Sequence, residues 1–224
     1  MSIQFLGMIG HRLASETHAP VGPILDKPYI AAFARAHEEA GFDRILVGYW
    51  SDQPDGFLVA AAAGLATSRI GLLLAHRPGF VAPTLAARKL ATLEHLLDGR
   101  LAVHIISGGS DADQRKDGDY LDHDQRYARS DEFIELLKRT WTSTEPFDFH
   151  GAHYRVEHAF SAIRPQQKPH IPVYFGGSSE AALKVAGKQA DVFMLWGEPL
   201  AQAAETISAV REQARSNGRE VEFS

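Results

Sequence analysis

The stretch RIGLLLAHRPGFVAPTLAARKLATLEHLLDGRLAVHIISGG, residues 69–109, contains two short apolar runs separated by one amphipathic run. The runs Ile70–His76 and Leu101–Ile106 have the length and composition of strands that are buried on both faces. Between them, Pro83 opens a helix that Gly99 ends, and the leucines of this helix share one face. A strand, a helix and a second strand in this order predict two parallel strands joined by a crossover helix.

The same alternation of strand and helix continues over most of the chain. Further strands are predicted at Ile3–Ile9, Ile45–Val47, Ile171–Phe175, Val192–Leu195 and Val221–Phe223, and further helices from Pro28 to Gly41, at Phe57–Ala66, Tyr127–Trp141, Glu180–Lys188 and Leu200–Asn217. Two segments depart from the pattern. Residues 110–125 are polar and predict a long loop that is mobile without a ligand, and Phe147–Val156 predicts a small hairpin outside the main sheet.

Two architectures have parallel strands with crossover helices, an open doubly wound sheet and a closed (β/α)8 barrel. A dinucleotide-binding sheet carries a Gly-rich turn after its first strand, and residues 8–12 lack such a turn. Polar residues instead follow the carboxyl ends of several different strands, which is typical of a barrel. We therefore predict an α/β TIM barrel in one domain, residues 1–224, incomplete here with about six strand–helix units and the start of a seventh strand.

Composition and charge exclude several classes of protein. The chain has a net charge of −5 and a pI near 6.1, which does not favour nucleic-acid binding. Because it has no cysteine, it forms no disulfide, thiolate zinc site, iron–sulfur cluster or cysteine nucleophile. Its apolar runs are too short to span a bilayer, and no signal peptide is recognisable. We expect a soluble, cytoplasmic protein without a membrane or nucleic-acid partner.

The segment Gly176-Gly177-Ser178-Ser179 lies between a predicted strand and a predicted helix. Glycines allow the backbone to approach a ligand closely, and the unpaired N–H groups at a helix start bind anions. These residues therefore predict a phosphate-binding site. The alternative is an ordinary strand-to-helix turn with a serine as the N-cap.

Other candidate residues also follow strands or begin helices. Ser107 ends a strand beside two glycines, and His123 and Tyr127 are four residues apart, so both can face the same side of a helix. Either these residues bind a polar ligand such as phosphate, or they are ordinary turn and surface residues. Trp196 either lines a pocket or packs in the core. Histidines near strand ends suggest a metal site as an alternative, but no strand carries a His-x-His pair; they are His11, His76, His104 and His123.

Several motifs resemble the bacterial luciferase-like flavin monooxygenases, and among these most closely the alkanesulfonate monooxygenase group. They are Arg77-Pro78 through Pro83-Thr84, Ala86-Ala87-Arg88, Ala91-Thr92-Leu93, Asp98-Gly99-Arg100, Leu121-Asp122-His123 with Arg126-Tyr127, Tyr174 through Ser179, and Trp196-Gly197-Glu198-Pro199. These motifs are spread over the whole chain in the order that the family has them.

The resemblance implies an enzyme that uses reduced FMN (FMNH2) and O2 to cleave an alkanesulfonate or related organosulfur compound to sulfite and an aldehyde. A separate NAD(P)H-dependent flavin reductase would supply the reduced flavin, and the enzyme would be a homo-oligomer without a catalytic metal. Carried over by position, the flavin and its phosphate would be held by His76, Ser107, His123, Tyr127, Gly177, Ser178 and Ser179. Catalytic roles would belong to Trp196 and His11, and Gln53 would contact the substrate.

Two departures from the family affect these expectations. The alkanesulfonate enzymes carry a cysteine after the second strand, where this chain has Gln53. Family members are also longer, and their next strand supplies the Arg and His that engage the sulfonate, so the resemblance implies the N-terminal portion of the barrel. The alternatives are a flavin-binding relative or fragment that is catalytically inactive, and a metal-dependent barrel hydrolase.

Overall fold

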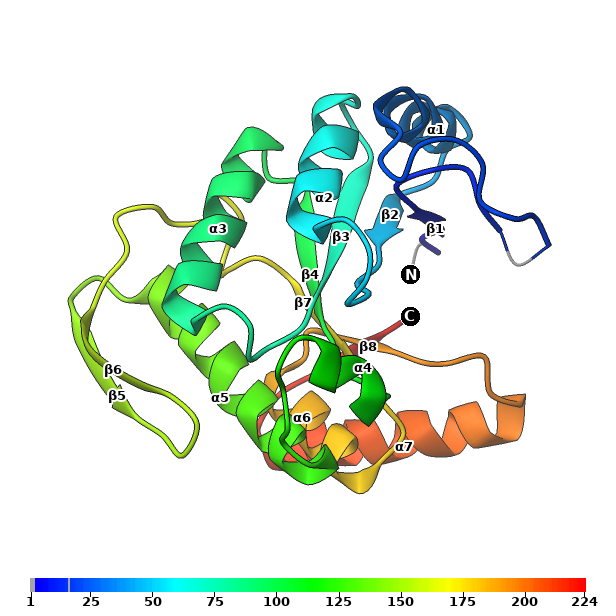
Figure 1. The fold of residues 1–224 in the computed structure, drawn as a ribbon. Coiled ribbons are helices and arrows are strands. Elements are labelled where there is room, and N and C mark those ends of the chain that lie inside the picture. Colours follow the sequence, from blue (N-terminus) through cyan, green and yellow to red (C-terminus); the bar gives the residue numbers. More distant parts are fainter. Residues whose placement is uncertain (1–2, 16) are drawn as a thin grey trace.

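A computed structural model describes residues 3–15 and 17–224 of the chain. Within these residues, seven strands form one parallel sheet in the order β1-β2-β3-β4-β7-β8-β9 (Figure 1). The strands are β1 (Leu6–Ile9), β2 (Arg44–Val47), β3 (Gly71–His76), β4 (Leu101–Ile105), β7 (Val173–Gly176), β8 (Val192–Met194) and β9 (Glu222–Phe223). Each prediction of a strand in the main sheet is therefore confirmed, with ends that differ from the predicted ones by no more than three residues.

The order of the strands distinguishes the two architectures that the sequence left open. Every neighbouring pair in the main sheet is parallel, and the order follows the chain without a reversal. A doubly wound sheet reverses its strand order at a switch point, whereas a barrel does not. The sheet curls in one direction and is open, with β1 and β9 at its edges (Figure 1). It is a half-barrel, which confirms the predicted incomplete barrel.

Helices cover the convex face of the sheet (Figure 1). They are α1 (Lys27–Glu39), α2 (Gly56–Leu65), α3 (Pro83–Leu96), α5 (His123–Thr142), α6 (Glu180–Gln189) and α7 (Leu200–Ser216), whereas the short α4 (Asp111–Lys116) lies in the connection between β4 and α5. Local chemistry fixes several of their starts. Asp26 and Asp55 cap α1 and α2 by accepting hydrogen bonds from backbone N–H groups. None of the helices in residues 3–15 and 17–224 is long and apolar enough to span a membrane.

The central strands β3 and β4 are buried on both faces, which explains their unbroken apolar runs. Leu72 and Leu74 of β3 pack with the helices in the larger core cluster, and Leu73 belongs to a smaller cluster on the concave face. That concave cluster also contains Ala102, Tyr174 and Val192, with Leu6, Leu46 and Met194 packed against it. All six residues of β3 are buried, so a polar substitution inside this strand has no solvent-facing side to occupy.

The predicted hairpin is confirmed. Strands β5 (Phe147–His150) and β6 (Arg155–Ala159) pair antiparallel in a separate two-stranded sheet beyond α5 (Figure 1). The carboxylate of Glu132 in α5 accepts hydrogen bonds from the backbone N–H groups of Ala152, His153 and Tyr154. Because this one carboxylate binds three backbone N–H groups of the hairpin loop, it fixes the hairpin to α5.

The prediction of a long irregular loop at residues 110–125 was wrong. This segment contains α4, and α5 already begins at His123. The Ser110 hydroxyl caps α4 by accepting from Asp113 N, and Asp122 with Gln125 forms a reciprocal capping box at the start of α5. Capping chemistry therefore prevailed over the low apolar content on which the prediction relied. The first strand is also shorter than predicted, because Ile3 and Phe5, which are 81% and 63% exposed, precede it.

The Glu38 carboxylate at the end of α1 holds the turn before β3. It accepts hydrogen bonds from the backbone N–H groups of Ser68, Arg69 and Ile70 at 3.0, 2.6 and 2.9 Å. These bonds, that from Ile70 foremost, lower the pKa of Glu38 to about 2. Since the folded protein favours the ionised carboxylate, the resulting stabilisation is present above the ordinary pKa of 4.5 and is lost as the pH falls toward about 2.

We predict that Glu38→Gln removes part of the acid sensitivity of the fold. Between pH 4.5 and about 2, the free energy of unfolding should fall more steeply for the wild type than for the variant, because only the wild type must protonate this carboxylate. Urea unfolding followed by circular dichroism at a series of pH values measures both slopes. Glu39→Gln, an exchange at the neighbouring exposed position, is the control and should keep the wild-type slope. Identical slopes for Glu38→Gln and the wild type would contradict this role.

Candidate functional site

The parallel sheet brings the predicted site residues to one end of the molecule. All seven strands run in the same direction, so the segments that follow them lie at one edge of the sheet. Ser107 follows β4, Gly177 follows β7, and Trp196 follows β8. The carboxyl ends of the strands carry the active site in (β/α)8 barrels. The predicted clustering of polar residues at several strand ends is therefore confirmed as a feature of the fold.

The turn between β7 and α6 is built around Gly177. Its φ of +144° lies in a region that residues with side chains rarely adopt. A Cβ at this position would also lie 2.6 Å from the Tyr127 hydroxyl and 2.7 Å from Ala182 Cβ. Ser179 is the N-cap of α6, and its hydroxyl accepts from Ala182 N at 3.2 Å. The segment is therefore a strand-to-helix turn with Ser179 as its N-cap, and this turn presents the start of α6 beside Tyr127.

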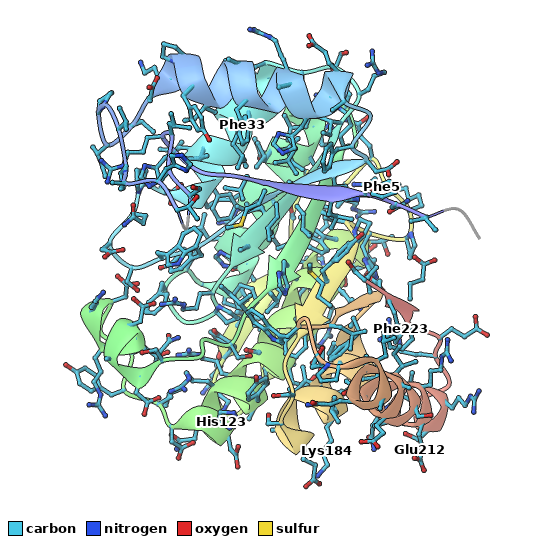
Figure 2. The ribbon with its side chains drawn as sticks, turned by 90° about the vertical axis from the view of Figure 1, so that its right-hand side faces the viewer. Phe5, Phe33, His123, Lys184, Glu212 and Phe223 are labelled. Carbon is cyan, nitrogen blue, oxygen red and sulfur yellow. The ribbon has the colours of Figure 1, made fainter. Side chains whose placement is uncertain are left out.

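Tyr127 and His123 lie together on the first turns of α5. Their ring centroids are 4.8 Å apart, which confirms that the two side chains share one side of the helix. Tyr127 also packs edge-to-face on Phe175 of β7, and burial raises the pKa of its phenol. The His123 ring is exposed at the start of α5, where its Nδ1 bonds to Asp124 Oδ1 at 2.7 Å (Figure 2). We name Tyr127, Gly177, Ser178 and Ser179, with His123 at their margin, the α6 cradle.

Ser107 is buried and faces the helices. Its hydroxyl lies 2.8 Å from the Ser130 hydroxyl, which donates to the carbonyl of Arg126 at 2.8 Å. The Ser107 side chain therefore fastens the end of β4 to α5, one turn along the helix from Tyr127. This contact places Ser107 beneath the cradle rather than among its exposed groups.

A residue that the sequence did not single out, Gln114 of α4, packs directly against Gly108. Gly108 has a φ of +89°, which favours glycine, and a Cβ there would displace the Gln114 side-chain amide. Gln114 is buried, and neither its Nε2 nor its Oε1 has a hydrogen-bond partner among residues 3–15 and 17–224. An unpaired buried amide is costly, which marks it as a group that a polar ligand could satisfy. The Ser-x-x-Asp capping pattern at residues 110–113 was the signal that could have revealed α4 and this residue.

Ion pairs fasten the α4 segment to the rest of the fold. Arg77, which follows β3, pairs with Asp113 of α4 at 2.6 Å and donates to the Ser51 hydroxyl at 2.9 Å. At the other end of the segment, the buried Asp119 accepts two hydrogen bonds from Arg129 of α5. Buried pairs of this kind are costly to break, because one charge then remains without a partner. They account for the ordered α4 in place of the loop that we predicted.

His76 is the last residue of β3, and its side chain is on the face of the sheet that the helices cover. Its ring packs against Phe57 of α2 and Phe133 of α5, on the convex side of the sheet. It is 3% exposed, and its Nε2 has no hydrogen-bond partner within the described residues. Burial, aided by the charge of Lys89, lowers the pKa of His76 to about 3, so the imidazole is neutral. The His76 carbonyl oxygen accepts a hydrogen bond from Ile106 N, so His76 lies beside the end of β4 that carries Ser107, while its ring faces the helices.

The three residues predicted for catalysis and substrate contact lie on loops after β1, β2 and β8. His11 Nδ1 bonds to the carbonyl oxygen of Ile24, and Gln53 donates to Asp52 Oδ1 at 3.0 Å. Trp196 is 73% exposed. All three residues follow the carboxyl end of a strand. His11 and Gln53 are not hydrogen-bonded to each other.

His104, the remaining strand-end histidine, points into the concave side of the half-barrel. Its Nε2 lies 3.7 Å from the position of a Cβ on Gly176 and has no partner in the described part of the chain. Burial lowers the pKa of His104 to about 4. In residues 3–15 and 17–224, no group of three or more His, Asp or Glu side chains could hold a metal ion.

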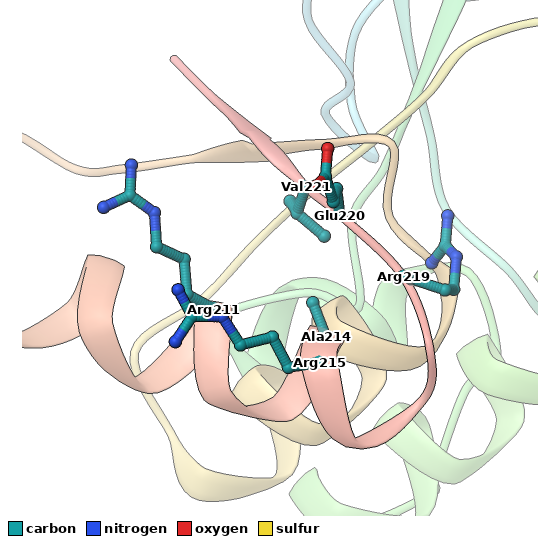
Figure 3. A pocket seen from close by; sticks show the side chains of 6 residues that line it. All are labelled: Arg211, Ala214, Arg215, Arg219, Glu220 and Val221. Atoms are coloured by element: carbon teal, nitrogen blue, oxygen red, sulfur yellow. The ribbon is translucent and has the colours of Figure 1, made fainter.

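A hollow of about 220 Å³ lies at the opposite end of the strands (Figure 3). It lies between the last turns of α7 and the segment that leads to β9, and it is lined by Arg211, Ala214, Arg215, Arg219, Glu220 and Val221. Arg219 pairs with Asp191 at 3.0 Å, and the Arg211 guanidinium lies over the Phe223 ring at 5.2 Å. These arginines are already engaged in contacts with their own fold, at the end of the sheet that carries structural rather than catalytic residues in barrels.

The sequence model of the family described as luciferase-like monooxygenase matches residues 3–224. A solved riboflavin lyase, bound to a modified FMN and riboflavin, superposes with a TM-score of 0.86 and 21% identity, over 100% of this chain and 61% of its own. The monooxygenase RslO1 from Streptomyces bottropensis superposes with a TM-score of 0.75 and 25% identity, over 87% of this chain and 61% of its own. An F420-dependent secondary alcohol dehydrogenase superposes with a TM-score of 0.81 and 21% identity, over 100% of this chain and 68% of its own. The chain thus spans about three fifths of the length of the first two.

We predict that Gly177→Ala destabilises the fold and displaces Tyr127. The substitution imposes a strained φ and a contact with the tyrosine hydroxyl, so the free energy of unfolding should fall by about 1–3 kcal/mol. Gly109→Ala is the matched control, because a Cβ there meets no atom of the described residues within 4 Å, and its stability should change by less than about 0.5 kcal/mol. Urea unfolding measures both values. Equal stability of the two variants would show that the close approach at Gly177 is not needed.

Proposed function

We propose that this chain, which belongs to the luciferase-like monooxygenase family, holds the phosphate of reduced FMN in the α6 cradle and acts in a flavin-dependent monooxygenase. The observation that carries the proposal is the geometry at Gly177. A glycine with φ of +144° packs against Tyr127 and leads into the capped start of α6. The start of a helix of ten residues offers unpaired N–H groups and a favourable dipole to an anion.

The residues around the cradle fit a phosphate ester. Two hydroxyls, those of Ser178 and Ser179, stand at the helix start, and the Tyr127 phenol lies against Gly177. The buried Arg126, adjacent to Tyr127, places a positive charge behind the cradle, although Asp111 at 2.9 Å compensates part of it. Gln114 adds an unpaired amide at the end of β4, where the less charged part of a flavin could be bound. Two carboxylates adjoin the cradle and are paired: Glu180, the first residue of α6, binds Lys184 at 2.7 Å, and Asp124 binds His123 at 2.7 Å.

When bound, reduced FMN supplies the electrons that activate O2. In this proposal the hydroxyls of Ser178 and Ser179 and the first N–H groups of α6 bind the phosphate. Tyr127 and His123 donate further hydrogen bonds from α5, and Ser107 positions that helix through Ser130. His11, Gln53 and Trp196 surround the entrance for the substrate, where the exposed Trp196 ring would exclude water once it is covered.

The substrate and the partners are proposed from the sequence resemblance. The substrate is an alkanesulfonate or a related organosulfur compound, which the reaction cleaves to sulfite and an aldehyde. A separate NAD(P)H-dependent reductase supplies FMNH2, and the enzyme is a homo-oligomer. Since one structural neighbour contains a modified FMN and another is F420-dependent, the identity of the cofactor needs a direct binding measurement.

We predict that Ser179→Asp abolishes tight binding of FMN and spares the fold. Aspartate also caps helices well, so α6 should persist. Its charge would face the phosphate, and FMN affinity should fall by about a hundredfold, while riboflavin, which lacks the phosphate, should be affected far less. Quenching of flavin fluorescence measures both dissociation constants. Ala201→Asp, in the exposed first turn of α7, adds the same charge elsewhere and is the control.

Two results would contradict the proposal at different levels. Equal losses for FMN and riboflavin would show that the cradle does not bind the phosphate. Tighter binding of coenzyme F420 than of FMN would show that F420, and not FMN, is the cofactor. If FMN binds as expected, an assay of sulfite release from alkanesulfonates with reduced FMN and O2 distinguishes the monooxygenase from a flavin-binding relative without activity.

A further inference from the structure

A second cavity, of about 140 Å³, lies between the ends of β2 and β3 and the first turns of α2 and α3. It is lined by Tyr49, Asp55, Gly56, Phe57, Ala75, His76, Arg77, Phe80, Val81 and Lys89. None of these residues belongs to the α6 cradle. Cavities of about 150 Å³ accommodate a molecule of the size of benzene, so this one can hold a small organic ligand.

Aromatic rings form the walls of the cavity. Tyr49 and Phe80 are stacked nearly parallel, with ring centroids 6.4 Å apart, and Phe57 packs edge-to-face on His76. The Arg77 guanidinium lies 4.4 Å from the Tyr49 centroid and closes one side. Aromatic walls of this kind bind the apolar body of a small ligand and leave its orientation to a few polar groups.

Lys89 supplies the uncompensated charge. Its Nζ lies 4.0 Å from the Phe57 centroid, and no carboxylate in residues 3–15 and 17–224 lies within 4.0 Å of it. Of the two other charged groups of the lining, Arg77 pairs with Asp113, and the Asp55 carboxylate accepts a hydrogen bond from Leu58 N at the start of α2 and keeps its negative charge. Lys89 is a partly buried residue without a carboxylate partner, so its ammonium is the group of the lining that attracts an anion.

His76 supplies an unused hydrogen-bonding atom in the same cavity. Its Nε2 is fully buried and has no partner within the described residues. A buried polar atom without a hydrogen-bond partner costs stability, so this ring nitrogen, close enough to Lys89 to be affected by its charge, indicates a ligand that satisfies both groups.

We propose that this cavity binds a small organic anion, a carboxylate or sulfonate with an apolar body of about the size of a benzene ring, whose acidic head group meets Lys89 and His76 Nε2. The head group accepts a hydrogen bond from Lys89 Nζ and one from His76 in the tautomer that carries its proton on Nε2, and its body lies among Phe57, Tyr49 and Phe80. The site is separate from the α6 cradle, and its occupation does not require a flavin. It therefore stands or falls independently of the proposed monooxygenase function.

Titration of the purified protein with benzoate and with benzenesulfonate, followed by the ¹⁵N resonances of His76, tests the proposal. We expect a saturable shift of the Nε2 resonance with either probe. Lys89→Met, which keeps the length of the side chain but removes its charge, should weaken binding at least about tenfold, whereas Lys89→Arg should retain it. Lys27→Met, at the exposed start of α1, removes a charge elsewhere and should bind like the wild type.

Each further outcome decides for or against the site. Unchanged binding by Lys89→Met, with circular dichroism showing an intact fold, would overturn the assignment, as would the absence of any His76 shift with both probes. Displacement of benzoate by FMN would show that the cavity belongs to the flavin site. Saturable benzoate binding in the presence of bound FMN supports two separate sites, and it would do so even if sulfite release were never observed.

Discussion

Parallel pairing of seven strands in chain order is the constraint on which the rest of this structure depends. Parallel strands cannot be joined by tight turns, so each connection must cross the sheet, and helices on one face provide the crossovers. The same constraint places every strand-to-helix loop at one edge. Residues separated by more than 160 positions, such as His11 and Gly177, therefore reach the same end of the molecule without any direct contact between them.

The α4 segment at this edge is held by ion pairs. Arg77 and Arg129 bind Asp113 and Asp119 on either side of α4, and these pairs are largely withdrawn from water. This arrangement keeps Gln114 against Gly108 and leaves its amide without a partner. The ion pairs thus have two consequences. They order the α4 segment, and they hold the Gln114 amide at a position where no group of the described residues forms a hydrogen bond with it.

The apolar runs and glycines were sufficient to predict the sheet, because Ile70–His76 and Leu101–Ile106 can be buried only as central strands. The pairing of His123 with Tyr127 followed from helical spacing in the same way. Hydropathy could not reveal α4, whose existence depends on the Ser110 cap and on arginines distant in sequence. Nor could it show that the His76 ring faces the helices. Both faces of β3 are buried and apolar, so its hydropathy pattern does not distinguish one face from the other.

Backbone amide shifts during addition of FMN to ¹⁵N-labelled protein test the central claim most directly. If the α6 cradle binds the phosphate, the largest shifts should fall on the N–H groups of residues 177–182, with smaller ones at His123 and Tyr127 on α5. Inorganic phosphate should reproduce the shifts at 177–182 at higher concentration. Shifts that fall instead around Lys89 and Phe57, or are absent from the start of α6, would contradict the assignment of the cradle.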